Sequence, residues 1–470
     1  MGQFKRILNE PTGVPQIDWV SDVPNDGVIY YRSLFNIERV VPTTPQALAE
    51  VLSTKSYEFI KPRQLRAGLG RILGVGLVLA EGDEHRTQRK NLMPAFSFRH
   101  VKDLYPTFWS KSRHLVENLV SDINEKMSSS PSESSVVVEI ANWSSRATLD
   151  IIGTAGLGKD FNALDDPETE LNRTYRKVLQ PSRAGQYLAF LSFIVPQRIV
   201  QALPVTHNNN IVESSEAIKR VARQLIRDKK AKMQVEGKRQ DIDILSVALE
   251  SGGFSDEDLV NQLMTFLAAG HETTATALTW AIYLLCKHPE VQRRLHKEIR
   301  ATLPSIESTE QITVSRLDSC TYLHAVCSEV LRLYAPVPIT LREAAKDTSI
   351  AGHFIPKGTA VMVCVWAINT STALWGPDAK DFNPDRWMGP GRAGSGGAAS
   401  NYSFLTFLHG PRSCIGQAFA RAEFACLVAA LIGRFDFELE DDNIELKIKG
   451  GITARPKDGL NVRMKPLEGW

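Results

Sequence analysis

The chain has 470 residues, of which 43% are hydrophobic, and its formal net charge at pH 7 is +2. This length permits two or three average domains, but it fits one large α-rich domain equally well. Its 55 basic and 53 acidic side chains nearly balance. That balance argues against nucleic acid as the main partner, which would favour a strong basic excess.

The cysteines and the apolar runs exclude two further classes of protein. No cysteine forms a C-x-x-C pair, so we expect a reducing compartment and not a secreted disulfide scaffold. All six lie in the second half of the chain: Cys286, Cys320, Cys327, Cys364, Cys414 and Cys426. No stretch reaches the roughly 18–20 apolar residues of a membrane span, and no signal peptide is visible. The chain as given is therefore expected to be soluble.

In chain order, the proline-rich start contains two β-like runs, Val28–Tyr31 and Ile37–Val41, and then a helical stretch at Pro45–Leu52. The middle of the chain has mainly helical apolar spacing. Two polar segments within it, Pro204–Asn210 and Lys229–Arg239, are expected to be connectors.

The longest predicted helix begins near Ser255 and continues to Cys286. Ser255 and Asp258 approximate a capping box, and Pro289 blocks extension at the other end. About 33 residues at ~1.5 Å each give a rod of roughly 50 Å. Such a rod would cross a whole large domain, so we expect one domain built around it.

The last third of the chain alternates between helices and strands. An apolar stripe predicts a helix over about Asp318–Tyr334. Strands are expected at Ile350–Ile355 and Ala360–Trp366. The final helix should start just after Cys414 and run to about Phe435.

The most specific signal is the ten-residue pattern that runs from Phe407 through Gly410, Arg412 and Cys414 to Gly416. The glycines let the backbone pass close to a flat ring. Cys414 precedes a helix, whose N-terminal amides favour a thiolate. Arg412 can pair with a carboxylate. The pattern therefore points to a cysteine thiolate that binds a metal within a planar cofactor.

This pattern, Phe-x-x-Gly-x-Arg-x-Cys-x-Gly, resembles the signature loop of the cytochromes P450, and the resemblance extends from about residue 30 to 465. It implies a mainly α fold with small β-sheets, as a single catalytic domain over residues 1–470. Haem b would lie between the long central helix and the helix after the cysteine loop, with Cys414 as its metal ligand. The β-rich part would cover about 20–60 and 347–370, and the helical part about 84–345 and 414–435.

A second motif, AGHETT at residues 269–274, lies in the middle of the longest helix. It is not a zinc site, because the second histidine of H-E-x-x-H is absent. Its glycine, acid and hydroxyls are poor helix formers, which a local opening of the helix would explain. The resemblance implies that Ala269 and Gly270 lie over the haem, and that Glu272 and Thr273 deliver protons to bound dioxygen.

Charged residues in three other places match further elements of the family. Glu329 and Arg332, spaced i and i+3, would ordinarily form a surface ion pair of little energetic value. The resemblance instead implies that they interlock with Arg386 beneath the haem and hold the cysteine loop. It also implies that His85, Arg89 and Arg342 contact the haem propionates, with His85 in place of the common tryptophan.

The resemblance is to fungal-like microsomal members of the family. It implies a monomeric monooxygenase that inserts one oxygen atom from O2 into a small apolar molecule. The natural protein would sit on the cytosolic face of the endoplasmic reticulum membrane, through an N-terminal anchor that this chain lacks. No flavin or nicotinamide motif is visible, so electrons should come from a flavoprotein reductase. Plausible basic contacts for it are Arg86, Lys90 and Arg421.

Two alternatives remain open at this point. One is a haem-thiolate isomerase or dehydratase that needs no reductase, and the other is a non-catalytic haem-binding protein. Family analogy places substrate contacts in Pro62–Ala80, around Tyr175–Val205 and in the Pro338–Leu341 turn. A role in secondary metabolism is expected. Fatty acids, terpenoids and alkaloids remain possible substrates, and both hydroxylation and oxidative coupling remain possible reactions.

Overall fold

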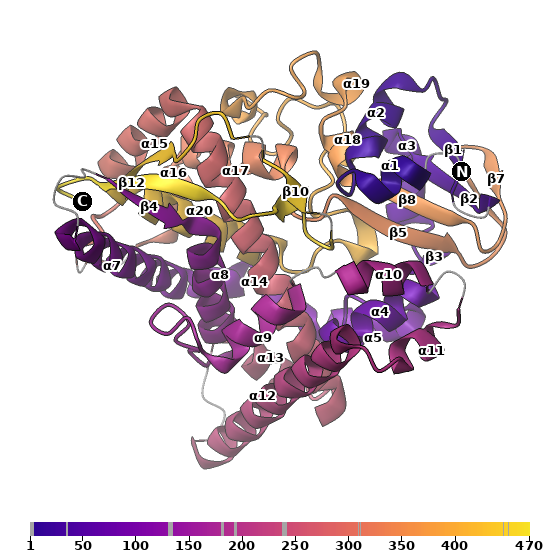
Figure 1. The fold of residues 1–470 in the computed structure, drawn as a ribbon, viewed down its shortest axis with the longest axis horizontal. Helices are drawn as coiled ribbons and strands as arrows, with labels where there is room; N and C mark the ends of the chain where they lie inside the picture. Colours follow the sequence, from indigo (N-terminus) through magenta and orange to yellow (C-terminus); the bar gives the residue numbers. More distant parts are fainter. Residues whose placement is uncertain are drawn as a thin grey trace. The chain divides into compact units, whose positions relative to one another are not determined.

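The computed structural model describes residues 4–33, 36–129, 135–179, 183–191, 195–236, 242–308, 310, 312–444, 446–449 and 451–470. Figure 1 gives the element labels. The chain folds into two compact units. Unit 1 consists of Met1–Ile60, Phe108–Ser145 and Thr273–Trp470, and unit 2 of Lys61–Thr107 and Arg146–Glu272. Three helices continue from one unit into the other: α7 (Tyr105–Ser129), α8 (Ile140–Ile151) and α14 (Asp256–Lys287).

Unit 1 contains the β-sheets of the described chain. A five-stranded sheet has the order β1 (Val28–Arg32), β2 (Glu38–Pro42), β8 (Ala360–Cys364), β5 (Ile339–Ala344) and β3 (Phe59–Ile60). A three-stranded sheet has the order β4 (Val136–Glu139), β12 (Asn461–Pro466) and β9 (Phe435–Leu439). Two hairpins pair β6 (Thr348–Ile350) with β7 (His353–Ile355), and β10 (Ile448–Lys449) with β11 (Arg455–Pro456).

Several elements of unit 1 contribute to one cluster of buried apolar side chains. Its members include Val361 and Val363 of β8, Leu52, and Leu405 from the segment just before the predicted cysteine loop. The helical elements are α1 (Phe4–Asn9), α2 (Val14–Asp22), α3 (Pro45–Ala49), η2 (Glu50–Thr54), α15 (Pro289–Thr302), α16 (Val314–Ser319), α17 (Thr321–Leu333), α18 (Val365–Asn369), α19 (Thr372–Trp375), η5 (Pro384–Trp387), η6 (Asn401–Ser403), η7 (Gly410–Arg412) and α20 (Gln417–Arg434). The loop that carries the signature motif is thus anchored by core packing at Leu405.

The regular elements of unit 2, among its described residues, are all helical. Its elements are α4 (Arg63–Leu73), α5 (Gly82–Leu92), η3 (Met93–Phe96), α6 (Phe98–Asp103), η4 (Ile152–Gly156), α9 (Glu170–Leu179), α10 (Arg183–Leu191), α11 (Gln197–Ala202), α12 (Thr206–Glu236) and α13 (Ile244–Glu250). The predicted capping box of α14 is confirmed: Asp258 N donates to Ser255 Oγ at 3.2 Å, and Ser255 N donates to Asp258 Oδ2 at 3.0 Å.

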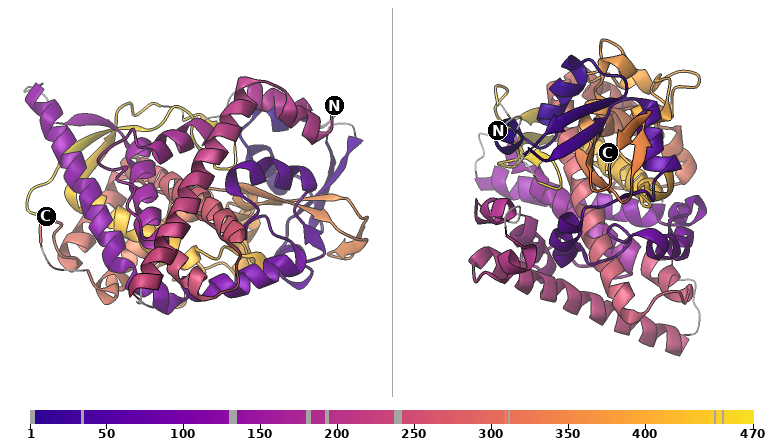
Figure 2. Two further views of the ribbon diagram at one scale, coloured as in Figure 1. Left: turned by 90° about the horizontal axis from the view of Figure 1, so that it is seen from below. Right: turned by 90° about the vertical axis from the view of Figure 1, so that its right-hand side faces the viewer.

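Several predicted elements were wrong in detail. The two polar segments expected to be connectors, Pro204–Asn210 and Lys229–Arg239, lie mostly inside α12. This helix has 31 residues and forms one continuous rod (Figure 2). The expected strand Ile350–Ile355 is a tight hairpin, because Ala351 adopts a φ of 49° and turns the chain. The next strand ends at Cys364, where α18 begins.

The mainly helical fold with small sheets is as predicted. Its single-domain organisation stays a prediction. No helix among the described residues combines the length and the apolarity that crossing a membrane requires.

Candidate functional site

The signature loop, residues 404–416, leads directly into α20. The backbone N–H of Cys414 donates to the carbonyl of Phe407 at 2.8 Å, which folds the loop back on itself. Gly410 has a φ of 76°, and a Cβ there would lie 2.2 Å from the carbonyl oxygen of Leu52 in η2. Glycine is therefore required at position 410, because the loop backbone runs directly against η2.

Cys414 differs from the other cysteines in its surroundings. Its residue is exposed, whereas the others are buried or half-buried: Cys286, Cys320, Cys327, Cys364 and Cys426. Burial raises the pKa of all five of these thiols, to about 12 at Cys286, Cys320 and Cys327. The thiolate is the form that binds a metal. The exposed Cys414 is therefore the candidate ligand among the six.

Glu329 and Arg332 on α17 form a buried ion pair, and both side chains are 0% exposed. Arg332 Nε and Nη2 donate to the two carboxylate oxygens of Glu329 at 2.8 and 2.7 Å. Arg386 Nε reaches Glu329 at 3.4 Å, and Trp387 Nε1 donates to Glu329 at 2.8 Å. The structure thus brings the three predicted charged residues together. An ion pair at i, i+3 spacing is ordinarily exposed on the helix surface, whereas this pair is buried.

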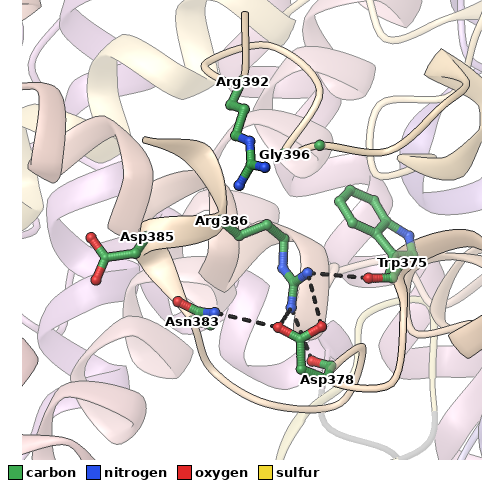
Figure 3. A pocket seen from close by; sticks show the side chains of 8 residues that line it. Trp375, Asp378, Asn383, Asp385, Arg386, Arg392 and Gly396 are labelled. Atoms are coloured by element: carbon green, nitrogen blue, oxygen red, sulfur yellow. Dashed lines mark hydrogen bonds and ion pairs between the residues drawn. The ribbon is translucent and has the colours of Figure 1, made fainter. Parts of the chain in front are cut away.

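The Nη2 end of the Arg386 guanidinium is held by a second carboxylate, that of Asp378 (Figure 3). Arg386 Nη2 donates to the Asp378 Oδ2 and carbonyl oxygens at 2.9 Å each. Asn383 Nδ2 donates to Asp378 at 3.3 Å. These residues line an open pocket of about 410 Å³ together with Arg392 and Gly396. Arg386 is therefore fixed at both ends by carboxylates.

Asn369 joins this cluster to the segment that precedes the cysteine loop. Arg332 Nη1 donates to the carbonyl of Asn369 at 2.8 Å. The Asn369 side chain donates to Thr406 Oγ1 at 2.9 Å and accepts from Leu405 N at 2.8 Å. The sequence motifs did not single out Asn369. The indole donor of Trp387 was also missed, although its position beside Arg386 was a usable signal.

Four side chains predicted to contact a haem propionate lie in two places. In unit 1, Arg342 is 3% exposed and donates to two groups of its own strand β5. Arg412 is 9% exposed, and its guanidinium lies 4.9 Å from the centre of the Tyr57 ring. In unit 2, the buried His85 and the half-buried Arg89 lie one turn apart on α5.

The AGHETT segment does not open the helix. α14 is α-helical from Asp256 to Lys287 without interruption, so the expected local opening was wrong. Close packing explains the glycine instead: a Cβ at Gly270 would lie 2.9 Å from Ile152 Cδ1 of η4. Ala269 is half-buried, Glu272 is buried and Thr273 is half-buried.

A buried acid on α20 was missed from the sequence. Glu423 is 1% exposed and lies beside the hydroxyl of Thr274, the residue after Thr273 on α14. Burial raises the pKa of this carboxyl well above its ordinary value, and Thr274 offsets only part of that shift. Burial in the interior of unit 1 therefore favours the neutral form of Glu423.

Comparison with known proteins identifies relatives along most of the chain. A family model described as "Cytochrome P450" matches residues 25–462. The chain is 48% identical to "Cytochrome P450 monooxygenase sphH" of Aspergillus fumigatus, over 96% of this chain and 83% of that protein. It is 43% identical to "Cytochrome P450 monooxygenase FUM15" of Gibberella moniliformis, over 98% and 85%. It is 41% identical to "Cytochrome P450 monooxygenase ALT8" of Alternaria alternata, over 99% and 87%.

Proposed function

Because the chain belongs to the cytochrome P450 family, a family of haem-thiolate oxidoreductases, we propose that Cys414 is the axial ligand of its haem. The chain is a cytochrome P450 monooxygenase. The observation that carries the ligand assignment is the exposed Cys414, the exception among six cysteines, in a loop pinned against η2. Bound haem supplies the chemistry that activates O2.

The residues around Cys414 fit such a group. Its exposed thiol is accessible to a ligand. Arg412 and Arg342 supply buried positive charge suited to carboxylates such as the haem propionates. Phe407, Gly410 and Gly416 shape the loop backbone. From unit 2, His85 and Arg89 are proposed as further propionate donors, and Ala269 and Gly270 as small residues beside the ring.

The cluster of Glu329, Arg332 and Arg386 is proposed to hold the cysteine loop in place and to take no part in the chemistry. Its support is the chain of hydrogen bonds from Arg332 through Asn369 to Leu405 and Thr406. Because the cluster's charges are buried, movement of any member would leave another unpaired. The single-domain organisation over residues 1–470 is proposed on the same basis as the family assignment.

Thr273 and Glu272 are proposed to hold the protons that oxygen activation consumes. Support comes from their adjacency on α14, where Glu272 is buried and Thr273 is half-buried, which limits access of bulk water. A Thr273→Ala variant should divert reducing equivalents to hydrogen peroxide, whereas Thr273→Ser, which keeps the hydroxyl, should restore product. The measurement is product and peroxide formed per NADPH. The same ratio of product to peroxide in the parent protein, Thr273→Ala and Thr273→Ser would contradict this role.

The substrate is proposed to be a small apolar molecule, and the electron donor a flavoprotein reductase. Exposed Val75 and Val78, in the predicted contact stretch, support an apolar ligand. The test first titrates the protein with apolar compounds and records its absorption spectrum. Each compound that binds is then incubated with the protein, ¹⁸O2, NADPH and a reductase. One labelled oxygen in the product supports the proposal. Turnover with a hydroperoxide alone would favour the isomerase or dehydratase.

We also propose that the natural protein is a monomer on the cytosolic face of the endoplasmic reticulum membrane. The curated relatives extend beyond the matched region, since this chain covers 83–87% of the three described above. Localising a fluorescent fusion of the complete reading frame tests this. A diffuse cytosolic signal would contradict it.

A further inference from the structure

Arg421 is one turn into α20, seven residues after Cys414, and the sequence suggested it as a contact for the electron donor. The structure shows a half-buried side chain that is already engaged. Its guanidinium carbon lies 5.2 Å from the centre of the Phe407 ring and 5.6 Å from that of Phe404. Its Nη1 donates to Ser328 Oγ of α17 at 3.2 Å. Both rings belong to the cysteine loop, so the charge of Arg421 is fixed against that loop.

This charge has no acidic partner within the parts of the chain that the structure describes. The polar contact of Arg421 is the neutral hydroxyl of Ser328, and burial lowers the pKa of the guanidinium itself. The nearby His324 adds little positive charge at neutral pH, because burial lowers its pKa and the charge of Arg421 acts in the same direction. A half-buried cation without a counter-ion interacts more strongly with neighbouring charges than an exposed one.

The position of Arg421 relates this charge to Cys414. Cys414 N is hydrogen-bonded to the Phe407 carbonyl, and the Phe407 ring contacts Arg421. Seven residues across a helix start span roughly 10 Å. Reduction of a thiolate-bound ferric iron adds one electron from an external donor and breaks no bond. A cation on the sulfur side therefore lowers the energy of the reduced, more negative form.

We propose that Arg421 raises the midpoint potential of the haem iron by holding an uncompensated positive charge against the cysteine loop. The proposal rests on the proposed ligation by Cys414. Arg421 acts through the electrostatics of the ligand and touches neither substrate nor the reacting atoms. Its stack on Phe404 and Phe407 and its bond to Ser328 keep the charge in one place.

The test measures midpoint potentials of purified holoprotein by spectroelectrochemical titration with dithionite, without any reductase. Arg421→Gln removes the charge, and Arg421→Lys keeps it. A second pair leaves Arg421 intact: Ser328→Asp places a carboxylate beside Nη1, and Ser328→Asn is its neutral counterpart. Arg434→Gln removes a cation from the far end of the same helix, roughly 20 Å away. The carbon monoxide spectrum of each reduced protein is recorded first.

Arg421→Gln and Ser328→Asp should both shift the midpoint potential in the negative direction. Arg421→Lys, Ser328→Asn and Arg434→Gln should stay close to the parent protein. Unchanged potentials in Arg421→Gln and Ser328→Asp, with intact thiolate spectra, would overturn the proposal while leaving Cys414 as ligand. If Arg421→Gln loses its haem, the proposal is tested by the midpoint potentials of Ser328→Asp and Ser328→Asn. A parent protein without a thiolate spectrum would instead overturn the proposed function.

Discussion

Glu329 on α17 and Glu423 on α20 are both buried inside unit 1, with exposed fractions of 0% and 1%. Glu329 accepts hydrogen bonds from Arg332, Arg386 and Trp387. Glu423 has the Thr274 hydroxyl as its polar neighbour, and burial raises its pKa. Equal burial thus gives the same side chain two different surroundings. Glu329 accepts hydrogen bonds that join α17 to η5, whereas burial favours the neutral form of Glu423.

The comparison shows that partners, and not burial, decide whether an interior charge is retained. Two guanidinium groups and an indole N–H surround Glu329, so the removal of its charge would leave cations buried. Burial already favours the neutral form of Glu423, so its replacement by glutamine removes little charge. The same substitution, glutamate to glutamine, should therefore have opposite consequences at the two positions.

The largest effect is expected for Glu329→Gln. Arg332 and Arg386 would lose their shared counter-ion in a site with 0–7% side-chain exposure. Breaking a buried ion pair in this way costs about 3–5 kcal/mol. We expect a matching fall in the free energy of unfolding and a lower haem-to-protein ratio, because the cluster supports the cysteine loop. Denaturant titration and haem absorbance measure both. Stability within error of the parent protein would refute this account of the cluster.

A smaller effect is expected for Trp387→Phe, which removes only the indole donor to Glu329 at 2.8 Å. A hydrogen bond to a charged group contributes about 1.5–3 kcal/mol. The matched control is Trp375→Phe, which removes a 3.1 Å bond to the neutral carbonyl of Ser403 and should cost about 0.5–1.5 kcal/mol. Thermal and denaturant unfolding of both variants sharpen the comparison. The two costs in reverse order would argue against a charge-assisted hydrogen bond from Trp387 to Glu329.

Glu423→Gln should leave stability at neutral pH unchanged or slightly increased. The folded pKa of Glu423 is raised, whereas an unfolded glutamate titrates near about 4.3. Stability from this group is fully present below that pH and decreases as pH rises toward the folded pKa. Glutamine does not titrate, so the stability of the variant relative to the parent should increase with pH across that window. Unfolding measured from pH 4 to 8 tests this; a decrease with rising pH would contradict it.

The smallest effect is expected for Asp385→Asn, next to Arg386 in sequence. Its partner is Arg294 at 2.8 Å, and the two side chains are 59% and 48% exposed. Exposed ion pairs contribute about 0–1 kcal/mol because solvent screens them. Denaturant titration at low and high salt should therefore show little change. If Asp385→Asn lowered the free energy of unfolding as much as Glu329→Gln, solvent exposure would not explain the difference between the Asp385 and Glu329 ion pairs.

The start of α14 and much of unit 1 could be predicted because their signals are local. The capping residues fixed the start of α14, and the Cys414 motif located α20. Glu329, Arg332 and Arg386 were predicted to interlock from a family pattern, and the structure brings them together. These features depend on residues near in sequence or on fixed motifs, so no tertiary information was needed to find them.

Features that depend on distant packing could not be predicted. The polar ends of α12 were mistaken for connectors, because runs of polar residues carry little apolar periodicity. The role of Gly270 is defined by Ile152, more than a hundred residues earlier. Arg421 looked like a surface cation until two phenylalanine rings were found against it. Composition and spacing do not reveal such contacts.

The most direct test of the account is the carbon monoxide spectrum of the reduced protein and of its Cys414→Ala variant, with Cys286→Ala as the control. We predict a thiolate-type Soret band in the parent and in Cys286→Ala, and its loss in Cys414→Ala. Persistence of that band in Cys414→Ala, or its absence from the parent protein, would contradict the assignment of Cys414 as the haem ligand.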